Sequence, residues 1–235
     1  MVCLRMDASC GNRNKEFEMP KYDLLMFDMD GTFIDSAHFH ISAYHRFFEK
    51  HKIDVKLGDT ILGLGFTIED FFHNIGVPDE RIDEVYEKLW RFYADDVDDL
   101  IREIPLAIGA KEVFRELKNR GYRMSVVTNS LQPVADRILT VHGLKDCFEA
   151  VEGATQQESD KEKRCGHVRD NHCKKGRIML VGDAGRDIEI ANTAGWDSCL
   201  AVGEIGWAAD PQDVIERFGP THVIHEFPEL LNILD

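Results

Sequence analysis

The chain has 235 residues and a formal net charge of −15 at pH 7. This length suits one large domain, or a core domain with a smaller one. The negative charge argues against nucleic acid or an anionic membrane as the main partner. No apolar run approaches the ~20 residues that a membrane-spanning helix needs. The six cysteines are scattered without a disulfide-rich pattern, so we expect reduced thiols and a cytoplasmic location.

The amino-terminal region leads into a short apolar run with acids at its end. Residues 1–20 are polar and aperiodic, and we expect a flexible leader there. Residues 24–27 are apolar and of strand length, and Asp28, Asp30 and Gly31 follow them. Ligands of open α/β sheets bind outside the carboxyl ends of strands. Two acids at such an end indicate a reaction centre, although Asp and Gly are also common in ordinary turns.

The chain changes character after this first strand. Residues 37–50 carry apolar side chains at helical spacing. The segment 67–70 resembles a capping box that opens a short helix, and another amphipathic helix begins near residue 78. From about residue 35 to 100 the pattern favours helices and no strand. It predicts a small all-helical cap domain, residues 35–102, inserted after the first strand.

The rest of the chain alternates helices with strands. This alternation predicts an α/β fold with a doubly wound, parallel, Rossmann-like sheet, whose core domain comprises residues 21–34 and 103–235. Ser130 is a candidate N-cap for the helix that follows the second strand. Strands are expected at 122–130, 148–151, 177–183, 198–202 and 221–225, and helices at 109–121, 131–141, 162–173 and 186–194.

Polar side chains follow three of these strands. They are Asp28 with Asp30, Thr128 with Asn129, and Asp183. Because the carboxyl ends of parallel strands lie at one edge of a sheet, we expect these residues to converge. Asp28 and Asp183 are suited to Mg²⁺, and Thr128 with nearby helix amides is suited to phosphate. One acid can attack phosphorus, and a second acid two residues on can serve the leaving group and then activate water.

These motifs resemble those of the haloacid dehalogenase-like superfamily, and within it the phosphoglycolate-phosphatase-like branch with a helical cap. The similarity spans about residues 22–227. The segment 28–32 (DMDGT) resembles the first motif, 127–130 (VTNS) the second and 182–187 (GDAGRD) the fourth.

The resemblance implies chemical roles for the acids of these motifs. Asp28 would be the nucleophile that forms an aspartyl-phosphate, and Asp30 would be the acid/base. Mg²⁺ would bind the Asp28 carboxylate, the backbone carbonyl of Asp30 and Asp183. Asp187 would support the metal site from the same loop as Asp183.

The resemblance also implies a phosphate site formed by Thr128, Asn129 and a lysine of the third motif. Here the sequence departs from the family pattern, because no proline follows either candidate, Lys161 or Lys163. We prefer Lys161, which lies where a loop passes into the predicted helix. Arg164 is a weaker third candidate.

Asp30 indicates phosphate-ester chemistry, because the dehalogenases and phosphonatases of the superfamily lack an acid at this position. We therefore expect a Mg²⁺-dependent phosphatase, a phosphoric monoester hydrolase, that acts on a small phosphorylated metabolite. The alternatives are a phosphosugar mutase and a catalytically silent binding protein on the same fold. His40 lies where mutases carry a histidine, but we favour a hinge or packing role. Gly63 and Gly65 fit a substrate loop or a simple turn equally well.

Overall fold

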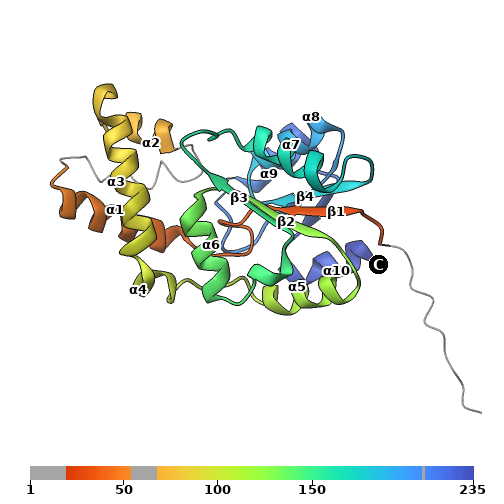
Figure 1. Cartoon of the computed structure of the whole chain (residues 1–235). Coiled ribbons are helices and arrows are strands. Elements are labelled where there is room, and N and C mark those ends of the chain that lie inside the picture. Colours follow the sequence, from red (N-terminus) through yellow and green to blue (C-terminus); the bar gives the residue numbers. More distant parts are fainter. Residues whose placement is uncertain (1–19, 54–67, 208–209) are drawn as a thin grey trace, which may run out of the picture.

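A computed structural model gives the arrangement of the chain (Figure 1). The residues that it describes are 20–53, 68–207 and 210–235. The predictions for residues 1–19 of the leader, for Thr67, and for Gly63 and Gly65 lie outside the described residues.

A six-stranded sheet with the strand order β3-β2-β1-β4-β5-β6 forms the centre of the molecule. Every neighbouring pair is parallel, as the alternating pattern predicts. β1 and β4 are apolar along their whole length because helices bury both of their faces. The strands are β1 (Leu24–Phe27), β2 (Met124–Leu131), β3 (Ala150–Ala154), β4 (Ile178–Gly182), β5 (Asp197–Ala201) and β6 (His222–Ile224).

Helices pack on both faces of this sheet (Figure 1). Alternate residues of β1 point to opposite faces: Phe27 packs in a cluster with Phe114 of α5, and Met26 packs in another with Val168 of α7. The sheet is therefore doubly wound. One face is covered by α5 (Ala110–Asn119), α6 (Gln132–Val141) and α10 (Leu230–Leu234), and the other by α7 (Lys161–His172), α8 (Gly185–Ala194) and α9 (Pro211–Phe218).

Every regular element that the structure describes between β1 and α5 is a helix or a helical turn, and the helices lie to the left of the sheet in Figure 1. Ile34 and Leu106 form an antiparallel bridge, so the two chain crossings into this segment lie side by side. The division into a core domain and a cap domain stays a prediction. The helices are α1 (Ala37–His51), α2 (Ile68–Asn74), α3 (Ile82–Asp95) and α4 (Asp98–Ile101), with a 3-10 turn η2 (Asp79–Arg81) before α3.

Two local predictions were wrong. β3 begins at Ala150 rather than at 148, because the 3-10 turn η3 (Lys145–Cys147) precedes it and Phe148 packs edge-on against Phe114. Ser130 is not a helix cap, because β2 continues to Leu131 and α6 begins only at Gln132. The carboxyl end of the chain adds a further 3-10 turn, η4 (Phe227–Glu229), before α10.

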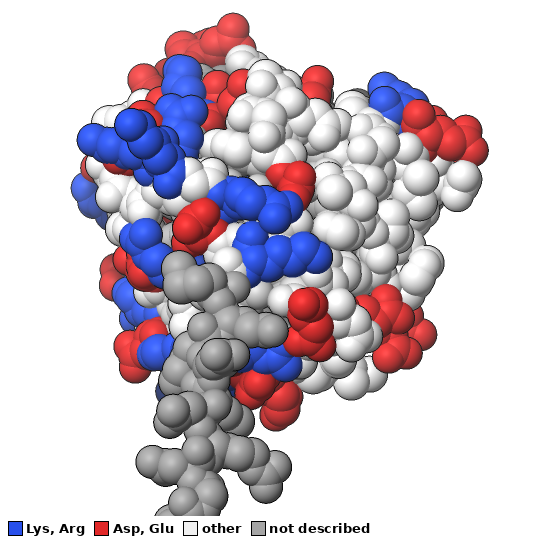
Figure 2. Space-filling model, turned by 90° about the vertical axis from the view of Figure 1, so that its right-hand side faces the viewer, with Lys and Arg blue, Asp and Glu red and all other residues white. Residues whose placement is uncertain are grey.

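The described surface carries charges of both signs. Figure 2 shows the end of the molecule opposite α1–α4, where Lys and Arg side chains are interspersed with Asp and Glu. On this face no large area carries one sign of charge alone. None of the described helices is both long enough and apolar enough to span a membrane.

Candidate active site

The three strands whose ends carry the candidate residues are neighbours in the order β2-β1-β4. Their carboxyl ends open into a cavity of about 260 Å³ between the sheet and the helices α1–α3. All the residues predicted for the site line this cavity: Asp28, Asp30, Thr128, Asn129, Lys161, Asp183 and Asp187.

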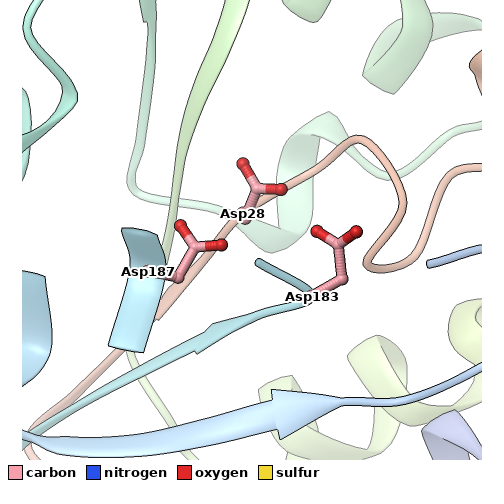
Figure 3. A group of neighbouring side chains, drawn as sticks. All are labelled: Asp28, Asp183 and Asp187. Carbon is pink, nitrogen blue, oxygen red and sulfur yellow. The ribbon is translucent and has the colours of Figure 1, made fainter. Parts of the chain in front are cut away.

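Three buried carboxylates form the centre of the site. One oxygen each of Asp28, Asp183 and Asp187 lies within 4.8 Å of the other two, and Figure 3 shows the carboxylates directed toward a shared space. The hydroxyl of Thr32 lies 3.3 Å from Asp28 Oδ2 and 3.3 Å from Asp183 Oδ1. Carboxylate oxygens are the ligands that hard divalent cations prefer, so this cluster fits Mg²⁺.

The electrostatics of the cluster agree with a cation site. Burial raises the pKa of Asp28 well above its usual value; Lys161 opposes this rise, and Asp187 adds to it. Burial, together with the charge of Asp187, also raises the pKa of Asp183 to about 7. Without a cation these carboxyl groups resist ionisation. A divalent cation would favour their charged forms and remove the mutual repulsion.

Lys161 is the ammonium group that reaches this cluster. Its Nζ lies 2.5 Å from Asp28 Oδ1 and 2.6 Å from Asp187 Oδ1. Burial alone would lower the pKa of Lys161, but Asp187 and Asp28 raise it overall, so the group stays charged. Lys161 is the first residue of α7, and Asp160 caps this helix by accepting from Glu162 N. The structure therefore brings Lys161 to the acids through the start of a capped helix.

Lys163 occupies a different position from Lys161. Its side chain is exposed, and its Nζ lies 3.7 Å from Glu158 Oε2. It does not line the cavity.

Asp30 is held by side chains from three segments of the chain. Ser36 Oγ donates to Oδ1 at 2.6 Å, and His40 Nε2 lies 3.1 Å from the same oxygen. Thr128 Oγ1 and Ser130 Oγ each donate to Oδ2 at 2.8 Å. Burial would raise the pKa of Asp30, but His40, Ser36 and Thr128 lower it to about 2. The carboxylate is thus ionised and fixed in orientation.

Sequence reasoning missed several members of this network. Thr32 and Ser130 lie inside the first and second motifs, but the sequence indicated only a helix cap for Ser130 and no role for Thr32. Ser36 gave no usable signal, because serine is common in turns. For His40 the sequence offers a mutase histidine or, as we prefer, a hinge or packing role. In the structure it joins helix α1 to Asp30, which connects the helical segment to the site.

The residues Thr128–Ser130 lie in an irregular part of β2. Val127 pairs with Glu152 and Leu131 pairs with Ala154, so three residues of β2 oppose one residue of β3. Such bulges redirect side chains and are common next to active sites. Here the bulge turns the hydroxyls of Thr128 and Ser130 toward Asp30.

Gly31 is required by the backbone at the end of β1. Its φ is 76°, in the left-handed region that favours glycine. A Cβ atom there would overlap Oδ2 of Asp183. That oxygen also accepts the backbone N–H of Trp207 at 2.5 Å. Gly31 therefore allows the first motif to approach the acid of β4.

The side of the cavity facing helices α1–α3 is mainly aromatic. Tyr44, Phe71 and Tyr93 line it, and the rings of Tyr44 and Phe71 are 4.4 Å apart between centroids. Among the described lining residues, Lys161 and Arg186 are the Lys and Arg side chains. The cavity is thus polar at the strand ends and largely apolar away from them.

Comparisons with known proteins bear on the family and the fold of this chain. A family model described as haloacid dehalogenase-like hydrolase matches residues 25–201. Pyrophosphatase PpaX of Halalkalibacterium halodurans is 26% identical over 218 residues, which cover 89% of this chain and 95% of that protein.

Solved structures share the fold. A predicted phosphoglycolate phosphatase from Haemophilus somnus 129PT superimposes with a TM-score of 0.74 at 18% identity, over 93% of this chain and 100% of that one. CbbY from Rhodobacter sphaeroides, solved with phosphate, superimposes with a TM-score of 0.67 at 18% identity, over 91% of this chain and 99% of that one.

The family match covers well over half of the chain and includes β1, β2, β4 and the helices between them. The resemblance inferred from the motifs is therefore confirmed. The enzyme class that the family and its relatives support is a phosphatase. This chain belongs to the haloacid dehalogenase-like hydrolases.

Proposed function

We propose that this hydrolase is a Mg²⁺-dependent phosphatase that cleaves a small phosphorylated metabolite through an aspartyl-phosphate on Asp28. One observation carries the proposal. Asp28, Asp183 and Asp187 form a buried acid cluster with Lys161, and Asp30 lies two residues beyond the nucleophile. A nucleophile, a counter-charge and a separate acid/base are the parts that a two-step displacement needs.

In the first step, a carboxylate oxygen of Asp28 bonds to phosphorus while the bond from phosphorus to the leaving oxygen breaks. Asp30, which is ionised in the substrate-free arrangement, takes up a proton from solvent as the substrate binds and gives it to that leaving oxygen. The substrate-free arrangement favours the ionised form of Asp30, so some of its hydrogen bonds must be exchanged when the substrate binds.

In the second step, water attacks the phosphorus of the aspartyl-phosphate and restores the Asp28 carboxylate. Asp30 takes a proton from this water, for which its ionised form is already suited. Lys161 balances negative charge at the phosphoryl group in both steps, and Thr128 and Asn129 orient that group.

The metal would be held by the carboxylates of Asp28 and Asp183 and the backbone carbonyl of Asp30, with Asp187 supporting it. When bound, Mg²⁺ supplies positive charge that stabilises the phosphoryl group during its transfer.

The cavity favours a small substrate, because its volume of about 260 Å³ leaves little room beyond a phosphoryl group and a compact organic part. The names of the relatives make pyrophosphate and phosphoglycolate the first compounds to test. We also propose that residues 35–102 act as a cap domain that excludes water when the substrate binds.

A phosphosugar mutase is the second candidate, because His40 of the helical segment contacts the acid/base Asp30. In a mutase the phosphoryl group would return to the sugar rather than pass to water. The two reactions therefore differ in whether inorganic phosphate is released.

The test is phosphate release from a panel of phosphorylated metabolites, with Mg²⁺ and with excess chelator. Asp28→Asn is measured beside the wild type, with circular dichroism to confirm its fold. We expect Mg²⁺-dependent release that the variant lacks. Isomerisation of a sugar phosphate without release would support the mutase, and full activity of Asp28→Asn would remove the nucleophile from the proposal.

A further inference from the structure

Arg164 is a buried arginine directly behind the phosphate-binding turn. It lies in α7, is only 1% exposed, and ranks among the largest fully buried side chains. Its Nη1 donates to the carbonyl of Glu158 at 3.2 Å. Its Nη2 donates to the carbonyl of Thr128 at 2.9 Å and to Asn129 Oδ1 at 2.9 Å.

Among the described residues, no carboxylate accepts a hydrogen bond from the guanidinium of Arg164. All three acceptors of its guanidinium are neutral oxygens, and the buried Nε has no hydrogen-bond partner. Within the described ranges, no acidic oxygen comes close enough to form an ion pair with it. A buried cation without a hydrogen-bonded counter-ion is costly. Burial lowers the pKa of Arg164 overall, and negative charges that include those of Glu158, Asp160 and Glu152 oppose this effect only in part. An anion bound near Arg164 would offset this cost and so stabilise the folded protein.

The contacts of Arg164 fall on the β2 bulge. The Thr128 carbonyl that accepts from Arg164 lies in the stretch where pairing with β3 shifts. This carbonyl and the N–H of Asn129 belong to one peptide group. A guanidinium that bonds the oxygen of a peptide fixes its plane and strengthens its N–H as a donor. Arg164 therefore acts on the backbone of the same turn that carries Thr128 and Asn129.

We propose that Arg164 is a positioning residue of the phosphate site, whose guanidinium orients the Thr128–Asn129 peptide and whose charge is balanced by the bound phosphoryl group. The inference rests on the proposed phosphatase function. The site would then have two cationic residues: Lys161, whose ammonium contacts Asp28 in the cavity, and Arg164, whose guanidinium contacts Thr128 and Asn129 from outside the cavity. A purely structural clamp between α7 and β2 is the competing explanation.

Two substitutions separate charge from structure. Arg164→Gln keeps a hydrogen-bond donor but removes the charge, and Arg164→Lys keeps the charge but loses the planar fork. Arg169→Gln is the matched control, because Arg169 lies exposed on the same helix and pairs with the neighbouring Asp170. The probes are inorganic phosphate, as a competitive product inhibitor and as a stabilising ligand in thermal melts, and phenyl phosphate as substrate, all with Mg²⁺.

We expect Arg164→Gln to raise the inhibition constant of inorganic phosphate by about tenfold or more, as for a lost hydrogen bond to a charged group. It should also reduce the rise in melting temperature that phosphate produces. Arg164→Lys should recover part of the lost phosphate affinity, and Arg169→Gln should match the wild type.

A structural clamp would lower the melting temperature of both Arg164 variants and leave phosphate affinity within twofold of the wild type. That result would overturn the inference. Should Arg164→Gln fail to fold, the lysine variant decides alone. A phosphate affinity more than twofold below that of the wild type, as expected when the planar fork is lost, supports the inference, and an affinity within twofold of the wild type refutes it. Asp28→Asn, assayed in parallel, keeps the two proposals apart, because its retained activity would count against the phosphatase mechanism only.

Discussion

Lys161 Nζ donates to Asp28 Oδ1 at 2.5 Å, although 133 positions separate the two residues along the chain. The contact brings the ammonium group of Lys161, at the start of α7, next to the carboxylate of Asp28, at the end of β1. It also connects the first motif with the third, for which Lys161 and Lys163 are the candidates.

This contact predicts different outcomes for the two lysine candidates. Lys161→Met should lower kcat by roughly 10²–10³-fold, the loss seen when one preorganised charge-stabilising donor is removed. Lys163→Met should stay within about twofold of the wild type, because its exposed ammonium lies outside the cavity. Steady-state phosphate release measures both. A larger loss at Lys163 would show that the wrong lysine has been placed in the site.

The hydrogen bond from Ser130 to Asp30 predicts an effect on kcat that the sequence did not suggest. Ser130→Ala removes one of the donors to Asp30 and should lower kcat by about tenfold, since hydrogen bonds to charged groups are among the stronger ones. Ser125→Ala is the control in the same strand. Its hydroxyl is buried without a hydrogen-bond partner in the described structure, so activity should be unchanged and stability equal or slightly higher. Equal activity of both variants would exclude a role for Ser130.

The acids of the site could be predicted because their placement follows from simple rules. Apolar runs identified β1 and β4, and parallel pairing brings the carboxyl ends of strands to one edge. Asp28 and Asp183 needed no further information. The preference for Lys161 over Lys163 depended on locating the start of α7, and the N-cap at Asp160 explains why that preference matches the geometry.

The remaining site residues depend on features that a sequence does not display. The bulge in β2 arises from register with β3, a strand whose start was misplaced by two residues. Without the bulge, Ser130 reads as an ordinary helix cap. Arg164 gave only a weak signal because a charged residue in a polar helix is normally exposed. Its burial follows from packing against β2 and from its contact with the Thr128 carbonyl.

The acid cluster predicts an unusual stability effect at Asp183. Asp183→Asn should raise the melting temperature of the metal-free protein, because it removes a buried charge that neighbouring acids disfavour. The same variant should lose the increase in melting temperature that Mg²⁺ gives the wild type. Glu226→Gln, at an exposed acid, is the control for a change of one charge. A melting temperature that falls on substitution, or an undiminished response to Mg²⁺, would contradict the cation site.

The pKa shifts also predict how the metal-free protein responds to pH. The raised pKa of Asp183, about 7, means that the folded state binds a proton that the unfolded state has released above about pH 4. The free energy of unfolding should therefore decrease as pH rises from about 4 to 7. The raised pKa of Asp28 acts in the same direction.

Urea unfolding in excess chelator at pH 5 and pH 7 measures this dependence. The wild type should be less stable at pH 7, and the difference should shrink in Asp183→Asn. Added Mg²⁺ should reduce the difference as well, because the bound cation favours the ionised acids. A free energy of unfolding that increases from pH 5 to pH 7 would show that ionisation of the acid cluster does not destabilise the metal-free protein.

Replacing Gly31 should reduce both the stability of the protein and its Mg²⁺ affinity. Gly31→Ala places a Cβ in the left-handed region, at a cost of about 1–2 kcal/mol, and this Cβ also overlaps Oδ2 of Asp183. Gly195→Ala is a matched control, because φ there is 70° but a Cβ would meet no atom within 4 Å. Both variants should lose stability, measured by urea unfolding with Mg²⁺. Only Gly31→Ala should also weaken Mg²⁺ binding, measured by calorimetry, because Asp183 must move to admit the new methyl group. Equal Mg²⁺ affinity in the two variants would show that Gly31 is needed only for its backbone conformation and not for the metal site.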